Sequence, residues 1–366
     1  MKFSKRHLSI VTICLLAIFL LAVVLVGAFG RGHRPSSDEV EAKEQIALIR
    51  RLAGKNTPLL FSPEFLILGE GKVDGLSTVA PGKAESEAAL GSPSFFSSLH
   101  REKHFTSILL APAQASSPLC TYLLESPLWS LKEVTPWGYL FLPVGSGEWI
   151  PPSEEEIIRN HPDPTLRAQW LIGSASNLIA IKRTKQAEQL LLEAGKTYRL
   201  PSLLLSAQAS LAASRGRWNE ALTLSRQALS KNSSNITARI ILVRALIECG
   251  KPDEAFSEAK KLRSLTLTRN TEALFLLARA ANAANDKNEE IQALREMISL
   301  AREHHQPLGA SLTYLGQAYA QNGERGMAMR TFDEALAAPE LTEEQREMIR
   351  QLIAHLKPEP AGQSGR

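Results

Sequence analysis

The sequence predicts a mainly α-helical protein in three parts: an N-terminal transmembrane helix, a small α/β domain and a C-terminal helical solenoid. Three observations carry this prediction. Residues 8–30 contain no charged residue, residues 55–152 combine short apolar runs with frequent Pro, Gly and Ser, and residues 153–356 repeat one helical-hairpin pattern. A chain of 366 residues is long enough for two folded units after a membrane segment.

The apolar segment at residues 8–30 predicts a membrane anchor. At about 1.5 Å per residue, a helix of this length crosses a hydrocarbon core of roughly 30 Å. A cleaved signal peptide is the alternative, since Val26-Gly27-Ala28 is a tolerable cleavage site. The apolar part of a signal peptide is usually shorter, at about 7 to 15 residues, so the anchor is favoured.

The orientation follows from the charges beside this segment. Lys2, Lys5 and Arg6 precede it, and positive charges favour the cytoplasmic side. Residues 1–7 then form a cytoplasmic tail, and everything from the linker at 31–54 onward is exported. In a bacterium, this predicts a single-pass inner-membrane protein with its soluble part in the periplasm.

The C-terminal part repeats at an interval of 34 residues. Ala187, Ala221 and Ala255 are 34 residues apart, as are Gly216 and Gly250. Small residues at this interval suit a seam where two helices approach closely, and glycine allows the left-handed conformation that ends a helix. Intervals of roughly 20 to 50 residues are typical of solenoids. The expected units are 168–201, 202–235, 236–269, 271–304 and 309–342, with extra length near His304-His305.

The last unit carries the clearest motif: Leu312, Leu315, Gly316, Tyr319, Gly323, Ala328, Phe332 and Ala335. These residues resemble the tetratricopeptide repeat (TPR) family, which implies a TPR-like helical solenoid. The other units are more degenerate, since Val243 and Glu290 stand where the family has small residues. Thr342 to Leu356 is expected to form a helix that caps the last repeat, and residues 357–366 a disordered tail.

A repeat array builds a surface rather than a reaction pocket, so it indicates partner binding. In the TPR family, the first helix of each unit lines the concave face, and the side chain after its small residue points inward. The resemblance places Ser210, Arg244, Arg279 and Gln317 there, with Asn282 one turn beyond Arg279. Two arginines on adjacent units suit a carboxylate or an acidic peptide. The alternative is that each arginine forms an ion pair with a neighbouring repeat.

These five residues depart from the Lys and Asn pattern of the family's carboxylate clamp, which counts against a chaperone tail as ligand. The expected partner is therefore a protein or peptide of unspecified kind. With 42 basic and 38 acidic residues, the net charge is only +4, and the soluble region has no basic run with interleaved aromatic residues. Nucleic acid is consequently not an expected partner.

The middle domain at residues 55–152 is expected to contain strands at 65–69, 105–112 and 138–143, with helices at 118–125 and 153–159. The order from Ala111 through Trp129 to Tyr139 faintly resembles the soluble domain of some lipid-linked sugar transferases. This resemblance keeps an alternative function open. The protein would then be an accessory or catalytic component of envelope glycan or lipid metabolism that acts through this domain.

The sequence offers no complete catalytic or metal-binding motif, and no catalytic residue, metal or cofactor is expected. His100 and His104 are four residues apart, but a zinc protease needs Glu directly after the first His. A solvated segment is favoured there. Leu68 to Val73 lacks the spacing of a phosphate-binding loop, so a turn is expected. The predicted function is a membrane-anchored, exported TPR scaffold rather than an enzyme.

Overall fold

The computed structural model describes residues 59–61, 83–105, 107–144, 149–197, 199–266, 270–303 and 307–356. The predicted transmembrane helix at 8–30, the linker at 31–54, the strand at 65–69, the turn at 68–73, the His304-His305 connection and the tail at 357–366 lie outside these residues. Within the described ranges, no helix is both long enough and apolar enough to cross a membrane.

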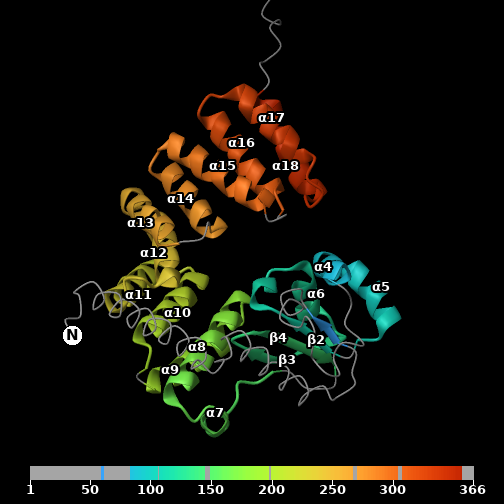
Figure 1. Cartoon of the computed structure of the whole chain (residues 1–366), viewed down its shortest axis with the longest axis vertical. Coiled ribbons are helices and arrows are strands. Elements are labelled where there is room, and N and C mark those ends of the chain that lie inside the picture. Colours follow the sequence, from blue (N-terminus) through green and yellow to red (C-terminus); the bar gives the residue numbers. More distant parts are fainter. Residues whose placement is uncertain are drawn as a thin grey trace, which may run out of the picture. The chain divides into compact units, whose positions relative to one another are not determined.

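Contacts divide the chain into two compact units (Figure 1). The sheet unit extends to residue 147 without residues 133–138, and the helical unit comprises residues 133–138 together with residue 148 onward. Each unit is described separately below.

The sheet unit contains a four-stranded sheet, apart from residues 133–138, in the order β1-β2-β4-β3. The strands are β1 (Leu59–Phe61), β2 (Ser107–Leu110), β3 (Trp129–Thr135) and β4 (Gly138–Pro143). β1 runs parallel to β2, and β2 runs antiparallel to β4 with Ile108 opposite Phe141. All four residues of β2 are buried, as expected for a strand covered on both faces. The strand predicted at 105–112 is shorter than expected, since β2 covers only residues 107–110. The predicted strand at 138–143 is confirmed as β4, and the predicted helix at 118–125 is confirmed as α6 (Pro118–Glu125).

Two helices of the sheet unit were not predicted: α4 (Lys83–Gly91) and α5 (Pro93–Lys103). Only Ser92 lies between them, since Gly91 ends α4 and Pro93 begins α5. Ser92 caps α5, because its Oγ accepts a hydrogen bond from the backbone N–H of Phe95 at 3.3 Å, and a proline at the first position is compatible with a helix start. The Ser and Gly content that suggested irregular structure here thus marks a helix end and the next helix start.

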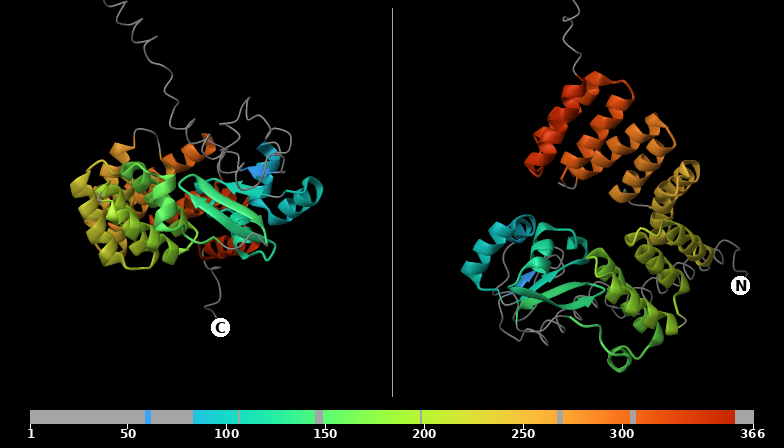
Figure 2. Two further views of the ribbon diagram at one scale, coloured as in Figure 1. Left: turned by 90° about the horizontal axis from the view of Figure 1, so that it is seen from below. Right: turned by 180° about the vertical axis from the view of Figure 1, so that it is seen from behind.

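The described part of the helical unit forms five helical hairpins after the short helix α7 (Glu154–Asn160). The hairpins are α8 (Pro164–Ala180) with α9 (Thr184–Lys196), α10 (Pro201–Ser214) with α11 (Trp218–Lys231), α12 (Ile236–Glu248) with α13 (Pro252–Leu265), α14 (Thr271–Ala283) with α15 (Lys287–Glu303), and α16 (Gly309–Gln321) with α17 (Arg325–Leu336). Helix α18 (Glu343–Leu356) follows the last hairpin. The right-hand view of Figure 2 shows the succession from behind. The predicted helical solenoid is confirmed, and α18 lies where the sequence predicts the capping helix.

The turn inside each hairpin contains a residue in the left-handed conformation. Gly216, Gly250 and Gly323 have φ of 73°, 68° and 80°, and Asn285 and Lys182 have φ of 60° and 62°. Nothing lies within 4 Å of a Cβ added at any of the three glycines, so glycine is favoured there by backbone conformation and not by space. The turns at Gly216 and Gly250 agree with those expected from the sequence, whereas the turn at Lys182 was not predicted.

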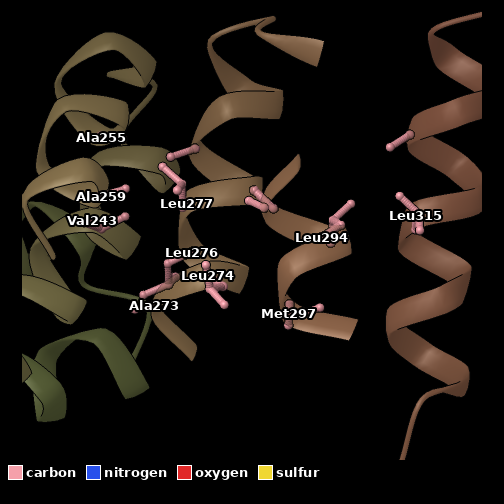
Figure 3. Close-up of a cluster of buried hydrophobic side chains, with 14 of the residues drawn as sticks. Val243, Ala255, Ala259, Ala273, Leu274, Leu276, Leu277, Leu294, Met297 and Leu315 are labelled. Atoms are coloured by element: carbon pink, nitrogen blue, oxygen red, sulfur yellow. The ribbon is translucent and has the colours of Figure 1, made fainter. Parts of the chain in front are cut away.

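One hydrophobic core runs from α10 to α18 in the helical unit. Figure 3 shows buried side chains of α12, α13, α14, α15 and α16 following one another along it. Ala221 and Ala255 of the 34-residue interval are fully buried, and so is Ala328 in the last hairpin. Because these side chains are small, the paired helices approach closely at the positions where the repeat places them.

Ion pairs connect the second helices of successive hairpins. The pairs are Arg226–Glu254 (2.5 Å) between α11 and α13, Arg263–Glu296 (2.6 Å) between α13 and α15, and Arg302–Glu334 between α15 and α17. These side chains are partly exposed, so each pair contributes only about 0 to 1 kcal/mol to stability. The hydrophobic core therefore holds the repeats together, and the ion pairs add to it.

Candidate interaction groove

The first helices of the hairpins form one side of the helical unit. Helices α8, α10, α12 and α14 pack against one another more extensively than the second helices do. We define the groove face as the solvent-facing side of α10, α12, α14 and α16. All five residues predicted as partner-binding lie on these helices: Ser210 on α10, Arg244 on α12, Arg279 and Asn282 on α14, and Gln317 on α16. Each is half-buried or exposed.

A hollow of about 420 Å³ opens between α14, α15 and α16. Its lining residues are Phe275, Ala278, Arg279, Asn282, Glu290, Leu294, Tyr314, Gln317 and Gln321. The hollow thus brings together three of the predicted residues, Arg279, Asn282 and Gln317. The other two, Ser210 and Arg244, are not among its lining residues.

The two arginines of the groove face differ in their partners. Arg279 Nη2 donates to Glu248 Oε1 on α12 at 3.2 Å, with both side chains about two-fifths exposed. For Arg279, the alternative of an ion pair with a neighbouring repeat therefore applies. Arg244 is exposed and makes no ion pair within the described residues. For both guanidinium groups to bind one ligand, Arg279 would have to contact the ligand and Glu248 at the same time.

Lys287, the first residue of α15, connects three polar groups of the hollow. Its ammonium donates to Asn282 Oδ1 at 2.7 Å, to Gln321 Oε1 at 2.6 Å and to Glu290 Oε2 at 3.1 Å. An ammonium has three donors and no acceptor, so these contacts use all of them. The network ties the fourth hairpin to the fifth, because Gln321 belongs to α16.

An aromatic pair forms an apolar wall of the same hollow. The ring centroids of Phe275 on α14 and Tyr314 on α16 lie 5.3 Å apart, with the planes tilted by 56°. This separation is typical of favourable aromatic contacts. The Tyr314 side chain remains 47% exposed, so much of its surface is open to a partner. The hollow therefore combines aromatic surface with amide groups.

Sequence reasoning did not identify Phe275, Tyr314, Gln321 or Lys287 as groove residues. The first three carry a usable signal, because each lies three or four residues from a predicted position on the same helix: Phe275 before Arg279, and Tyr314 and Gln321 on either side of Gln317. Lys287 is the first residue of a second helix, whereas the family pattern used for the prediction covers only the first helices. Only the folded chain brings it to the hollow.

Burial shifts the pKa values of a cysteine and a histidine among the described residues of the sheet unit. Burial raises the pKa of the Cys120 thiol to about 12, so the thiol stays protonated and unreactive at neutral pH. His100 is half-buried among the rings of Phe96 at 5.9 Å and Trp129 at 5.3 Å, which corrects the expectation of a solvated segment at this histidine. Burial, and then nearby His104, lower the pKa of His100. No group of three or more potential metal ligands occurs in the part of the chain that the structure describes.

Comparisons with known proteins identify the repeat type in part of the helical unit. A family profile described as Tetratricopeptide repeat matches residues 212–263, from the end of α10 into α13. This match confirms the TPR resemblance for that segment. No curated protein sequence matches the chain.

Several solved structures are similar to about half of the chain. TTC0263, a thermophilic TPR protein from Thermus thermophilus, is 15% identical, with 51% of this chain and 99% of that chain covered and a TM-score of 0.42. YrrB, a TPR protein with an unusual peptide-binding site, is 14% identical, with 55% and 100% covered and a TM-score of 0.43. MamA from Desulfovibrio magneticus RS-1 is 15% identical, with 46% and 93% covered and a TM-score of 0.41.

Proposed function

We propose that this chain is a scaffold that binds a protein or peptide segment on its groove face. The observation that carries the proposal is the hollow between α14, α15 and α16, which is lined by the aromatic side chains of Phe275 and Tyr314 and by the amide side chain of Gln317. The hollow offers both polar groups and aromatic surface, and its volume of about 420 Å³ lies within the usual range of roughly 300 to 1,000 Å³ for ligand sites. The TPR assignment of residues 212–263 supports the proposal, since such repeats serve protein and peptide binding.

Site-specific photo-crosslinking tests the groove face directly. A photoreactive benzoylphenylalanine would replace Tyr314 or Gln317, which line the hollow. The matched controls carry it at Gln227 on α11 or Ser299 on α15, which are exposed positions on second helices. We expect one partner to be crosslinked from the two groove positions and not from the two controls.

The affinity of the crosslinked partner provides a quantitative test of binding on the groove face. Purified partner should bind the Tyr314→Ala/Gln317→Ala variant at least about tenfold more weakly than the wild type, because the variant loses both aromatic surface and an amide. The Gln227→Ala/Ser299→Ala variant should bind as the wild type does. Equal crosslinking from all four positions, or equal affinities of both variants, would show that the partner does not bind in the groove.

We further propose that the scaffold is a single-pass membrane protein, anchored through residues 8–30 with its repeats on the exported side. The support is in the sequence: an uncharged segment of this length after Lys2, Lys5 and Arg6. A C-terminal alkaline phosphatase fusion should be active, and the intact mass of the purified protein should include residues 8–30. An inactive fusion contradicts the orientation, while a mass that lacks these residues identifies a cleaved signal peptide.

A further inference from the structure

We propose that the hollow selects an uncharged, extended peptide segment, and that Lys287 sets this preference by turning the amides of Asn282 and Gln321 into hydrogen-bond donors. The inference rests on the proposed function and adds the chemistry of the bound segment. Lys287 acts as a positioning residue, through the two amides that it holds.

The orientation of both amides follows from the chemistry of lysine. An ammonium group donates hydrogen bonds and accepts none, so each amide must turn its oxygen toward Lys287. The contacts agree: Nζ lies 2.7 Å from Asn282 Oδ1 and 2.6 Å from Gln321 Oε1. Each NH₂ group is consequently the free end of its side chain. Neither Asn282 Nδ2 nor Gln321 Nε2 has a partner among the described residues, and both residues line the hollow.

When a ligand displaces water from the hollow, the two amide donors require acceptors from that ligand. The backbone carbonyl oxygens of an extended segment are such acceptors, because a segment outside regular secondary structure leaves them unpaired. The tilted rings of Phe275 and Tyr314 offer contact to a large apolar side chain of the same segment. The hollow is therefore equipped to bind both the backbone and one apolar side chain.

The charges around the hollow argue against an acidic segment. Arg279 is paired with Glu248, and Lys287 is paired with Glu290, whose side chain is only 8% exposed. The two cations and two carboxylates cancel, so a ligand carboxylate gains no net attraction. This revises the acidic peptide that the two arginines suggested. A neutral carbonyl oxygen needs no countercharge and accepts from the amides directly.

Peptide selection on the full-length chain is the test. A phage-displayed library of random dodecapeptides would be selected on the purified protein, and the selected peptides would be synthesised and measured by fluorescence anisotropy. We expect them to share an aromatic or branched aliphatic residue without enrichment of Asp or Glu. Their dissociation constants should change by less than about threefold between low and high salt, because exposed charge pairs would be screened by salt and neutral hydrogen bonds are not.

Two substitutions isolate the donor role of the amides. Asn282→Asp and Gln321→Glu retain an oxygen for Lys287 and replace each NH₂ group by a second oxygen. We expect each to weaken peptide binding by about threefold to tenfold, the effect of losing one hydrogen bond. The matched control is Gln227→Glu, which makes the same change at an exposed position on α11 and should leave affinity unchanged.

The outcomes separate this inference from the proposed function. If the selected peptides are rich in Asp and Glu and their binding is sensitive to salt, the inference is wrong. Binding in the groove still holds in that case if Tyr314→Ala abolishes peptide binding. If neither Asn282→Asp nor Gln321→Glu changes the affinity, the inference is also wrong, and binding in the groove still holds. Selected peptides that bind Tyr314→Ala as tightly as the wild type, or a selection that yields no binding peptide, would overturn both proposals.

Discussion

Gly316 on α16 faces the ring of Phe332 on α17 so closely that an added Cβ would lie 2.6 Å from Phe332 Cε1. The ring itself is buried, with 1% of its surface exposed. The two helices of the last hairpin therefore meet ring against backbone. This contact explains why the TPR-like motif has glycine and an aromatic residue at these two positions.

The Gly316→Ala substitution should lower the free energy of unfolding by about 1 to 3 kcal/mol, because the methyl group forces the ring or the helix to move. The measurement is urea denaturation followed by circular dichroism. Gly326→Ala on α17 is the matched control, since nothing lies within 4 Å of its added Cβ. Its alanine should leave stability unchanged or raise it by up to about 1 kcal/mol. Equal losses in both variants would contradict the close approach of Gly316 and Phe332.

The left-handed turn at Gly250 provides a second prediction. Its φ is 68°, and an added Cβ would meet nothing within 4 Å. Gly250→Ala should therefore destabilise the fold by about 1 to 2 kcal/mol through backbone conformation alone. Gly250→Asn should cost less, because asparagine tolerates this conformation, as Asn285 does in the turn between α14 and α15. Identical losses for Ala and Asn would argue against a conformational cause.

The Arg279–Glu248 pair can be measured with a double-mutant cycle. Because both side chains are about two-fifths exposed, the coupling free energy from Arg279→Ala, Glu248→Ala and the double variant should be about 0.2 to 1 kcal/mol. Arg244 makes no ion pair within the described residues, so the cycle of Arg244→Ala with Glu248→Ala should give a coupling near zero. A larger coupling for Arg244 than for Arg279 would reverse the assignment of partners on the groove face.

His161 predicts a pH dependence of stability. Its ring stacks on Trp170 at 5.0 Å, and burial, followed by nearby Arg167, lowers its pKa below 6.5. The unfolded chain therefore binds this proton more readily than the folded chain, and the free energy of unfolding should fall as the pH drops below 6.5. His161→Phe retains the stacked ring and removes the titration.

Denaturation curves of both proteins at several pH values between about 7.5 and 5 test this assignment. The wild type should lose more stability than His161→Phe over this range. The same loss in both proteins would mean that other groups cause the pH dependence.

The helical hairpins were predictable because their causes are local in sequence. The 34-residue interval predicts which alanines are buried, such as Ala221 and Ala255, and the glycines of the turns mark the ends of the first helices. Helices α4 and α5 were missed because Gly91-Ser92-Pro93 was counted as irregular composition. Ser92 at the capping position indicates the start of α5, and this signal is local in the sequence.

The groove face was predictable only in part. Asn282 and Gln317 follow from the repeat register, which places them on first helices beside one hollow. The partner of Arg279 could not be predicted, since Glu248 is 31 residues away and its contact depends on how two repeats pack. Lys287 was missed for the same reason, because its contact with Gln321 spans 34 residues and joins two hairpins. Networks between repeats require the folded structure.

Hydrogen exchange measured by mass spectrometry, with and without a saturating bound partner or selected peptide, tests the central claim most directly. The account predicts slower exchange in α14 (Thr271–Ala283) and α16 (Gly309–Gln321), the helices that carry the groove residues. Exchange in α11 (Trp218–Lys231) and in β2 to β4 should remain unchanged. Protection confined to second helices or to the sheet unit, with α14 and α16 unaffected, would contradict a binding groove on the first helices.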